Sequence, residues 1–275
     1  MTKNNRQDQD LVQVAKRLGN KKRGYLVVNP LQGKHIPVSG KRALSLFQTL
    51  GDRVLAGGLP SPVLFIGFCE TATAIGAAVA AKNKGMYLQT TREAVEGVSF
   101  IDFLEEHSHA MTQRLVKEDL EDALEKARSV VFVEDEITTG NTIGNILRIL
   151  NRDYPGKKYA MASLLNGMDQ EALAACASRG VEIFYLVKTD HQTFEAQVEG
   201  LTEDGIVESY FPFQDLEDPL ESHVFADCPG EVLEFSSPLR TRRRMQGETY
   251  EKETGRLWAF LDSRLDFSKY ARVLM

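Results

Sequence analysis

The chain has 275 residues, of which 43% are hydrophobic and 26% are charged, a balance typical of a globular protein with a buried core. The formal net charge of -6 argues against general nucleic-acid binding. No apolar run approaches the ~20 residues of a membrane span, and the polar first residues do not resemble a secretory signal. The three cysteines lack CxxC spacing, which argues against a disulfide framework or a zinc site. We therefore expect a soluble, cytoplasmic protein.

The N-terminal region begins polar and ends basic. Residues 1–23 close with Lys21, Lys22 and Arg23, which indicates an arm or a short leading helix. The segment GYLVVNP, residues 24–30, predicts a strand that Pro30 ends. A loop over residues 31–40 follows, and Ser39 is a suitable cap for a helix over residues 41–54.

From residue 63 onward, short apolar strands alternate with helices. The strands are predicted over residues 63–68, 86–91, 130–136, 157–166 and 181–189. The intervening helices are predicted over residues 71–85, 117–129, 141–150 and 169–180, while residues 92–115 read as long and irregular. The strands are apolar on both faces, which favours an α/β fold with a mostly parallel open sheet covered by helices on both sides.

The composition changes after Lys188. No Lys or Arg occurs from Thr189 to Leu239, where acidic residues accumulate, and four arginines follow between residues 240 and 244. We therefore divide the chain into an N-terminal arm (1–23), a main domain (24–200) and a C-terminal extension of unknown role (201–275). The arginine cluster is more typical of a solvated or subunit-contact face than of an RNA site.

The central motif is VVFVEDEITTGNT, residues 130–142. A buried strand is followed by a hydroxyl-rich turn and a helix, and ligands bind at such carboxyl ends of parallel strands. The turn offers backbone N–H groups and the positive end of the helix dipole, which suits a phosphate monoester. The predicted phosphate-binding residues are Thr138, Thr139, Gly140, Asn141 and Thr142.

Two carboxylates directly precede this turn. The sequence lacks the GxxxxGK[ST] pattern of nucleotide triphosphatases and the GxGxxG pattern of dinucleotide-binding proteins. Glu134 and Asp135 are separated from the turn by about the length of one sugar ring, and carboxylates accept hydrogen bonds well from vicinal hydroxyls. We therefore expect these acids to hold the ribose of a ribose 5-phosphate. An ordinary capped helix start without a ligand is the alternative.

The stretch of residues 130–142 resembles the phosphoribosyl diphosphate (PRPP) motif of type I phosphoribosyltransferases. The resemblance implies magnesium-dependent transfer of a 5-phosphoribosyl group from PRPP to a nitrogenous base or related acceptor, with release of pyrophosphate. Mg²⁺ would be held indirectly by Glu134 and Asp135. Glu136 departs from the family pattern, and this third acid either points to solvent or touches magnesium.

The resemblance also implies a second loop that wraps the pyrophosphate. GFCETATAIG occupies its place, and Gly67 permits unusual backbone angles there. The amides of Cys69 to Thr71 are expected to face an anion, but the acidic Glu70 requires a magnesium ion, another partner or an outward direction. A tight turn without a ligand is the alternative. The predicted pyrophosphate loop comprises Gly67, Phe68, Cys69, Glu70 and Thr71.

Three further residues are candidates for catalysis. In YLQTTRE, Arg92 is the candidate clamp on the departing pyrophosphate, the alternative being a surface arginine. His107 and His109 of EEHSHA either handle protons and pyrophosphate on a mobile loop or belong to a solvated loop. Zinc binding is not expected because no third ligand is evident.

The motifs together are similar to the phosphoribosyltransferase-like proteins of bacterial tellurite-resistance and stress-response gene clusters, over roughly residues 24 to 200. For the acceptor pocket, Lys34 and His35, or the segment near Asp190 and His191, are the candidates. A PRPP-binding regulatory module without transferase activity is the alternative function. The sequence leaves the acceptor unidentified and a homodimer open, and it predicts neither an RNA partner nor a membrane.

Overall fold

The computed structural model describes residues 11–17, 24–34, 38–103, 113–199, 235–237 and 243–264. The chain divides into two compact units. The first unit draws on residues 1–39 and 192–236, and the second on residues 40–191 and 237–275. The motif of residues 130–142 belongs to the second unit.

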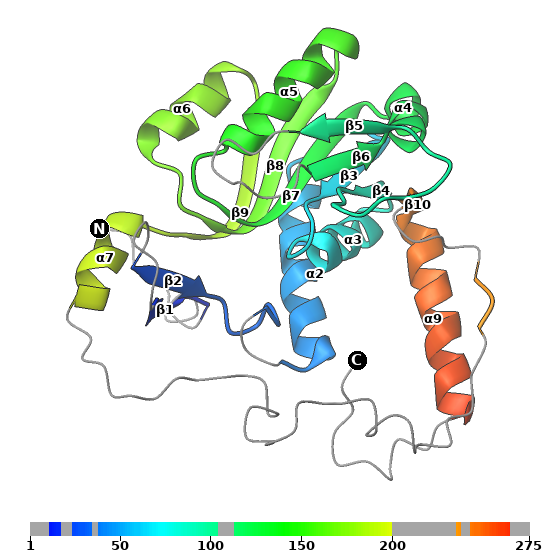
Figure 1. Ribbon diagram of the computed structural model, residues 1–275, viewed down its shortest axis with the longest axis horizontal. Helices are drawn as coiled ribbons and strands as arrows, with labels where there is room; N and C mark the ends of the chain where they lie inside the picture. The colour runs from blue at the N-terminus through cyan, green and yellow to red at the C-terminus, as the bar shows by residue number, and fades with distance from the viewer. Residues whose placement is uncertain are drawn as a thin grey trace. The chain divides into compact units, whose positions relative to one another are not determined.

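The second unit is built on an open, largely parallel sheet (Figure 1). In spatial order its parallel strands are β4 (Met86–Gln89), β3 (Val63–Gly67), β7 (Ser129–Ile137), β8 (Lys158–Asn166) and β9 (Glu182–Lys188). Strand β3 is buried along its whole length, as its continuous apolar sequence predicts for a sheet with covered faces. The prediction of an α/β fold with a mostly parallel sheet is confirmed.

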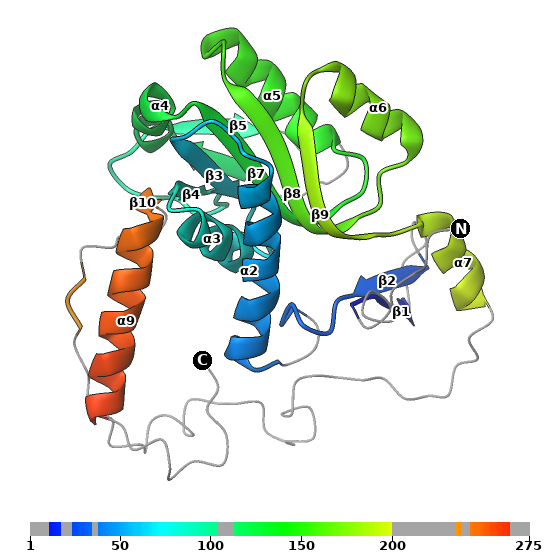
Figure 2. The same ribbon diagram turned by 180° about the vertical axis from the view of Figure 1, so that it is seen from behind.

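Helices cover both faces of this sheet. Figures 1 and 2 show α2 (Gly40–Ala56) and α3 (Thr73–Lys82) on one side, with α5 (Asn141–Asp153) and α6 (Gln170–Ser178) on the other. The apolar stripe predicted for α5 faces the sheet, since Ile143, Ile146 and Leu150 are at most 1% exposed. Within the described part of the chain, no helix is both long and apolar enough to cross a membrane.

The segment of residues 92–115 is less irregular than expected. Strand β5 (Phe100–Phe103) pairs antiparallel with β6 (Gln113–Val116), and α4 (Lys117–Lys126) follows directly. Arg114 ties the pair together, because its Nε lies 3.4 Å from Asp102 Oδ1 and its guanidinium lies 5.0 Å from the centre of the Phe100 ring. The expectation of an irregular segment is wrong in this part, because four-residue strands separated by nine residues carry no short-turn signal.

The first unit contains a small antiparallel sheet. Strand β2 (Tyr25–Val28), which the sequence predicted, pairs with β1 (Gln13–Lys16). The alternative of a leading helix is therefore wrong for the described residues 11–17. In the same unit, Phe194 of α7 (His191–Glu199) packs edge-on against Tyr25 with ring centroids 5.8 Å apart.

The described end of the predicted C-terminal extension belongs to the second unit. Strand β10 (Met245–Gln246) pairs antiparallel with β4 at the edge of the sheet, and α9 (Gly247–Arg264) packs against α3. The N–H of Gly247 donates to Gly85 O at 2.7 Å, and a Cβ on Gly247 would lie 2.7 Å from Ala80 O. The expected boundary near residue 200 thus does not separate this segment from the sheet.

Candidate functional site

The central motif lies where β7 ends and α5 begins. Residues 130–133 are fully buried, whereas Thr138 and Thr139 are exposed. Gly140 has a φ of 73°, a left-handed conformation that side chains disfavour, and it is the N-cap of α5. Its carbonyl accepts a hydrogen bond of 2.8 Å from the N–H of Gly144. Gly140 is therefore the residue that turns the chain from strand to helix.

This turn has the chemistry of an anion site. The first N–H groups of a helix have no partner within the helix, and the helix dipole places partial positive charge there. Asn141 and Thr142 are the first residues of α5, although their side chains lie outside the described part of the structure. The turn itself carries no Lys or Arg. A bound anion would therefore be held by N–H groups and hydroxyls.

The side chains of Glu134 and Asp135, both within β7, point to opposite faces of the sheet, because side chains alternate along a strand. Both are half-buried. Glu134 lies beside Ser163 of β8 in the strand register. On the other face, Asp135 Oδ1 accepts a hydrogen bond of 3.0 Å from Thr71 Oγ1. A sugar lying across the end of β7 would have one carboxylate on each side.

The contact between Thr71 and Asp135 brings the two predicted loops together, although they are 64 residues apart in the chain. The N–H of Phe68 also donates to Val133 O at 3.1 Å, which continues the pairing of β3 with β7. The loop after β3 is thus adjacent to Asp135 at the end of β7.

Gly67 is required for space and not for an unusual backbone angle. Its φ is not positive, contrary to the expected reason for a glycine there. A Cβ on Gly67 would lie 2.8 Å from Tyr87 Oη and 2.9 Å from Ala72 O. The Tyr87 hydroxyl donates to Thr73 O at 2.8 Å. The missing side chain therefore allows the start of α3 to lie close to the sheet.

The backbone of the second loop is only partly available to an anion. The N–H of Cys69 donates to Thr90 Oγ1 at 2.8 Å, so the expectation that this amide faces an anion is wrong. The Cys69–Glu70 peptide bond is cis, and the N–H of Thr73 donates to Glu70 O at 3.3 Å. The amides of Glu70 and Thr71 remain as the candidates from this loop.

Arg92 lies beside this loop, just beyond the end of β4. Its Nη1 is 3.8 Å from Glu70 Oε1. The Arg92 side chain is 26% exposed and that of Glu70 is 76% exposed, and exposed ion pairs contribute only about 0–1 kcal/mol. Arg92 is thus the cationic partner of Glu70 in this structure. A more highly charged anionic ligand could replace Glu70 as the partner of Arg92, because little free energy is lost when this exposed ion pair breaks.

The third acid of the motif, Glu136, faces a histidine. Its Oε1 lies 3.0 Å from Nε2 of His191, and the two side chains are 18% and 20% exposed. Of the two alternatives for Glu136, the one in which it points to solvent is wrong, because its side chain is largely buried against His191. Contact with magnesium stays a prediction. His191, which the sequence placed near the acceptor pocket, follows β9 and reaches back across β8 to the motif.

Four predicted site residues do not belong to the described part of the second unit. His35, His107 and His109 lie outside the described residues, and Lys34 belongs to the first unit. Among the described residues, no cluster of three or more His, Cys, Asp or Glu side chains could hold a metal ion alone. Mg²⁺ usually takes one or two carboxylates, with substrate phosphates and water as its other ligands. The carboxylates of β7 fit a metal that arrives with such a substrate.

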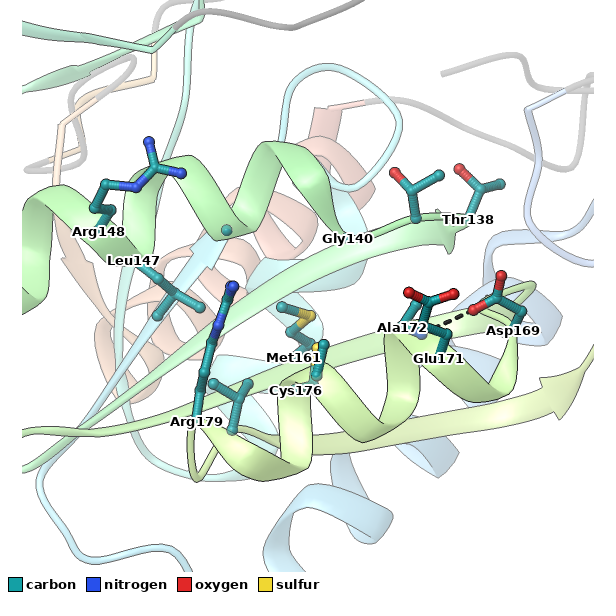
Figure 3. A pocket seen from close by; sticks show the side chains of 14 residues that line it. Thr138, Gly140, Leu147, Arg148, Met161, Asp169, Glu171, Ala172, Cys176 and Arg179 are labelled. Carbon is teal, nitrogen blue, oxygen red and sulfur yellow. Dashed lines mark hydrogen bonds between the residues drawn. The ribbon is translucent and has the colours of Figure 1, made fainter.

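A pocket of about 380 Å³ lies between α5 and α6 (Figure 3). Thr138 and Gly140 line one end, and Arg148 and Arg179 line it farther along the two helices. Burial raises the pKa of the Cys176 thiol in its wall, although the charge of Arg179 acts in the opposite direction. Neither arginine stands out in the sequence, because Arg148 lies within an ordinary helix and Arg179 directly follows one, and only the fold brings both to this pocket.

A family profile described as "Phosphoribosyl transferase" matches residues 11–190. A search of curated proteins found no significant match.

Solved structures with a similar fold include adenine phosphoribosyltransferases. That of Rhodothermus marinus is 12% identical, covers 66% of this chain and 97% of its own, and has a TM-score of 0.47. That of Trypanosoma brucei, in complex with AMP, pyrophosphate and ribose-5-phosphate, is 13% identical, covers 68% and 79%, and has a TM-score of 0.48. UMP synthase of Leishmania donovani is 17% identical, covers 69% and 36%, and has a TM-score of 0.41. Because the family profile spans well over half of the chain, the protein belongs to the phosphoribosyl transferase family.

Proposed function

We propose that this phosphoribosyltransferase moves the 5-phosphoribosyl group of PRPP to a nitrogenous base or related acceptor and releases pyrophosphate. The observation that carries the proposal is the hydrogen bond of 3.0 Å between Thr71 and Asp135. It joins the candidate pyrophosphate loop to Asp135, one of the two carboxylates that precede the candidate phosphate turn. Substrate oxygens on both sides of the reacting carbon would then be held by neighbouring parts of one sheet edge.

The 5′-phosphate binds to the turn of residues 138–142. Backbone N–H groups at the start of α5 and the hydroxyls of Thr138 and Thr139 donate to its oxygens. Gly140 allows the turn, because its φ of 73° is strained for other residues. Glu134 and Asp135 accept hydrogen bonds from the 2′- and 3′-hydroxyls of the ribose.

The pyrophosphate binds at the loop after β3. The amides of Glu70 and Thr71 donate to it, and Arg92 leaves Glu70 to pair with it. Glu134 and Asp135 would hold Mg²⁺ indirectly, and when bound the ion would supply positive charge that stabilises the departing pyrophosphate. The two carboxylates orient the ribose and favour the positive charge that develops on the sugar ring. A covalent nucleophile from the chain is not required.

The test measures pyrophosphate release from PRPP with a panel of bases. We expect Asp135→Asn and Thr139→Ala each to lower kcat/KM by about 10²-fold or more, because each removes a group that positions the substrate. Asp153→Asn and Thr49→Ala, on the exposed surfaces of α5 and α2, are the matched controls and should retain full activity. Full turnover in both site variants would overturn the proposal.

A second candidate is a regulatory module that binds PRPP without transferring the sugar. The ion pair of Glu70 with Arg92 favours it, because the acid places negative charge at the pyrophosphate end. Calorimetry that detects magnesium-dependent PRPP binding, together with no pyrophosphate release on any base, would select this function. We also propose that the chain belongs with the phosphoribosyltransferase-like proteins of bacterial tellurite-resistance gene clusters and that it acts in the cytoplasm.

A further inference from the structure

A polar site lies next to the candidate ribose site, at the carboxyl ends of β8 and β9. Asn166 and Thr189 are 0% and 4% exposed. Asn166 Nδ2 and Thr189 Oγ1 have no hydrogen-bond partner among the described residues. A buried polar atom without a partner costs about 1–3 kcal/mol. By the strand register, Thr189 lies on the face of the sheet that carries Glu136, whereas Asn166 lies on the other face. The Thr189 hydroxyl is therefore the unpartnered buried group that a polar ligand beside Glu136 would satisfy.

The backbone around these atoms is firmly held. The N–H of Gly167 donates to Ile137 O at 2.8 Å, and the N–H of Thr189 donates to Asn166 O at 2.8 Å. The side chain of Asn166 is itself fixed, because its Oδ1 accepts from the N–H of Met168 at 2.9 Å. The ends of β7, β8 and β9 therefore form one rigid edge in which the Asn166 amide cannot turn away without breaking a contact.

The imidazole of His191 occupies the space above this edge. A Cβ added to Gly167 would collide with the His191 ring and would lie 3.3 Å from Thr189 Oγ1. Only glycine therefore leaves room for a ring at this position. The ring meets a carboxylate as well, because its Nε2 lies 3.0 Å from Glu136 Oε1.

Glu136 is close enough to the proposed ribose-binding acids to contact the same ligand. It lies two residues beyond Glu134 on the same face of β7, which puts the two Cα atoms about 7 Å apart. A group attached to a sugar at Glu134 is thus within reach of Glu136. The third acid of the motif then has a separate target, since the sugar is already flanked by the first two.

We propose that Glu136 determines acceptor specificity by accepting a hydrogen bond from a ring N–H of a nitrogen heterocycle, and that His191 holds this place when no acceptor is bound. The inference rests on the proposed transfer function. The side chain of His191 ends in an imidazole, which is itself a nitrogen heterocycle with an N–H donor. Its position beside Glu136 shows that the site has room for a polar ring of this size. An acceptor displaces the ring of His191 and gains Thr189 Oγ1, which lies on the same face of the sheet, as a hydroxyl partner.

The first experiment uses imidazole as the probe on the full chain. In His191→Ala, imidazole should bind by calorimetry and raise Tm, whereas the wild-type protein should respond at least 10-fold more weakly because its own ring competes. At about pH 9, well above the pKa of an imidazole, 1-methylimidazole has no N–H. The affinity of His191→Ala for 1-methylimidazole should be at least roughly 10-fold lower than for imidazole, since the hydrogen bond from the ring N–H to the carboxylate of Glu136 is lost.

The second comparison adds Glu136→Ala to the His191→Ala background. Imidazole affinity should fall about 10-fold or more, whereas Glu182→Ala, an exposed acid at the start of β9, should leave it unchanged. Imidazole binding that is equal with and without Glu136, equal for 1-methylimidazole, or absent in His191→Ala would overturn the inference.

Ribose 5-phosphate binding, measured in the same proteins, separates this inference from the proposed function. If the wild-type chain does not bind ribose 5-phosphate, the proposed function fails. If it binds ribose 5-phosphate while imidazole binding is independent of Glu136, only the acceptor site fails.

Discussion

At the scale of single residues, two glycines shape the site for different physical reasons. Gly140 is needed for its left-handed φ of 73°, which the turn before α5 requires. Gly67 is needed for space, because Tyr87 and the backbone of Ala72 occupy the position of a side chain. The first requirement follows from a local turn, which a sequence pattern can indicate. The second depends on a strand and a helix start that only the fold brings into contact.

We expect Gly67→Ala to lower the free energy of unfolding by about 1–3 kcal/mol, because the added methyl group overpacks a rigid contact. Urea unfolding followed by circular dichroism measures the change. The matched control is Gly255→Ala in α9, where a Cβ meets nothing within 4 Å. There the same substitution should stabilise the protein by up to about 1 kcal/mol, since alanine favours a helix more than glycine. Equal effects at both positions would contradict the packing argument.

At the scale of elements, the end of the predicted extension is attached to the sheet domain by charge as well as by pairing. Arg243 donates two hydrogen bonds to Asp119 of α4, at 2.7 and 2.9 Å, and Arg244 forms an ion pair with Asp122. These two arginines are therefore paired within the domain, which argues against an RNA surface built on them. The attachment lies where β10 covers the edge of β4, the strand that leads to Arg92.

This attachment should depend on pH. Burial acts to raise the pKa of Asp119, but the hydrogen bonds from Arg243 and the Arg244 N–H outweigh it and hold the pKa below its ordinary value. The stabilisation is therefore complete above the unfolded value of about 3.9 and is lost as the pH falls through the lower folded value. Asp119→Asn should cost about 1.5–3 kcal/mol near neutral pH and progressively less in acid.

Urea unfolding of wild type and Asp119→Asn at a series of pH values measures this difference. Asp262→Asn, an exposed position on α9, is the control and should differ little from wild type at any pH. A difference for Asp119→Asn that stays constant from neutral pH into acid would show that the ion pair does not carry the attachment.

At the scale of the whole molecule, the strands of the two units differ in how extensively they are paired and buried. In the second unit, β7 is paired on both sides within the sheet and is buried over residues 129–133. Among the described residues of the first unit, β1 pairs only with β2, and β1 is largely exposed. A two-stranded sheet is marginal in isolation, whereas a central strand opens only when its whole unit unfolds.

We therefore expect amide hydrogen exchange in residues 130–133 to be slower by at least about 10²-fold than in residues 13–16, because stabilities of local opening differ by several kcal/mol between such elements. Mass spectrometry of peptides after deuterium labelling measures both segments in one experiment. Comparable exchange rates in the two segments would contradict the expected difference in their stability against local opening.

Much of the fold was predictable because it depends on local pattern. Continuous apolar runs between helices predict buried parallel strands, and the apolar spacing of α5 predicts the face that packs on the sheet. The pairing of β5 with β6 and of β10 with β4 was not predictable, since short strands carry little pattern and their partners lie far away in the chain.

The sequence by itself determined the strand, turn and helix of residues 130–142 and the order of acids, hydroxyls and glycine along them. These features depend on residues that are neighbours in the chain, so their physical effects are local. Only the tertiary structure decided which groups meet: Asp135 with Thr71, Glu70 with Arg92, and Glu136 with His191. Those contacts follow from the order of strands in the sheet, which brings loops together at its carboxyl edge regardless of their distance in sequence.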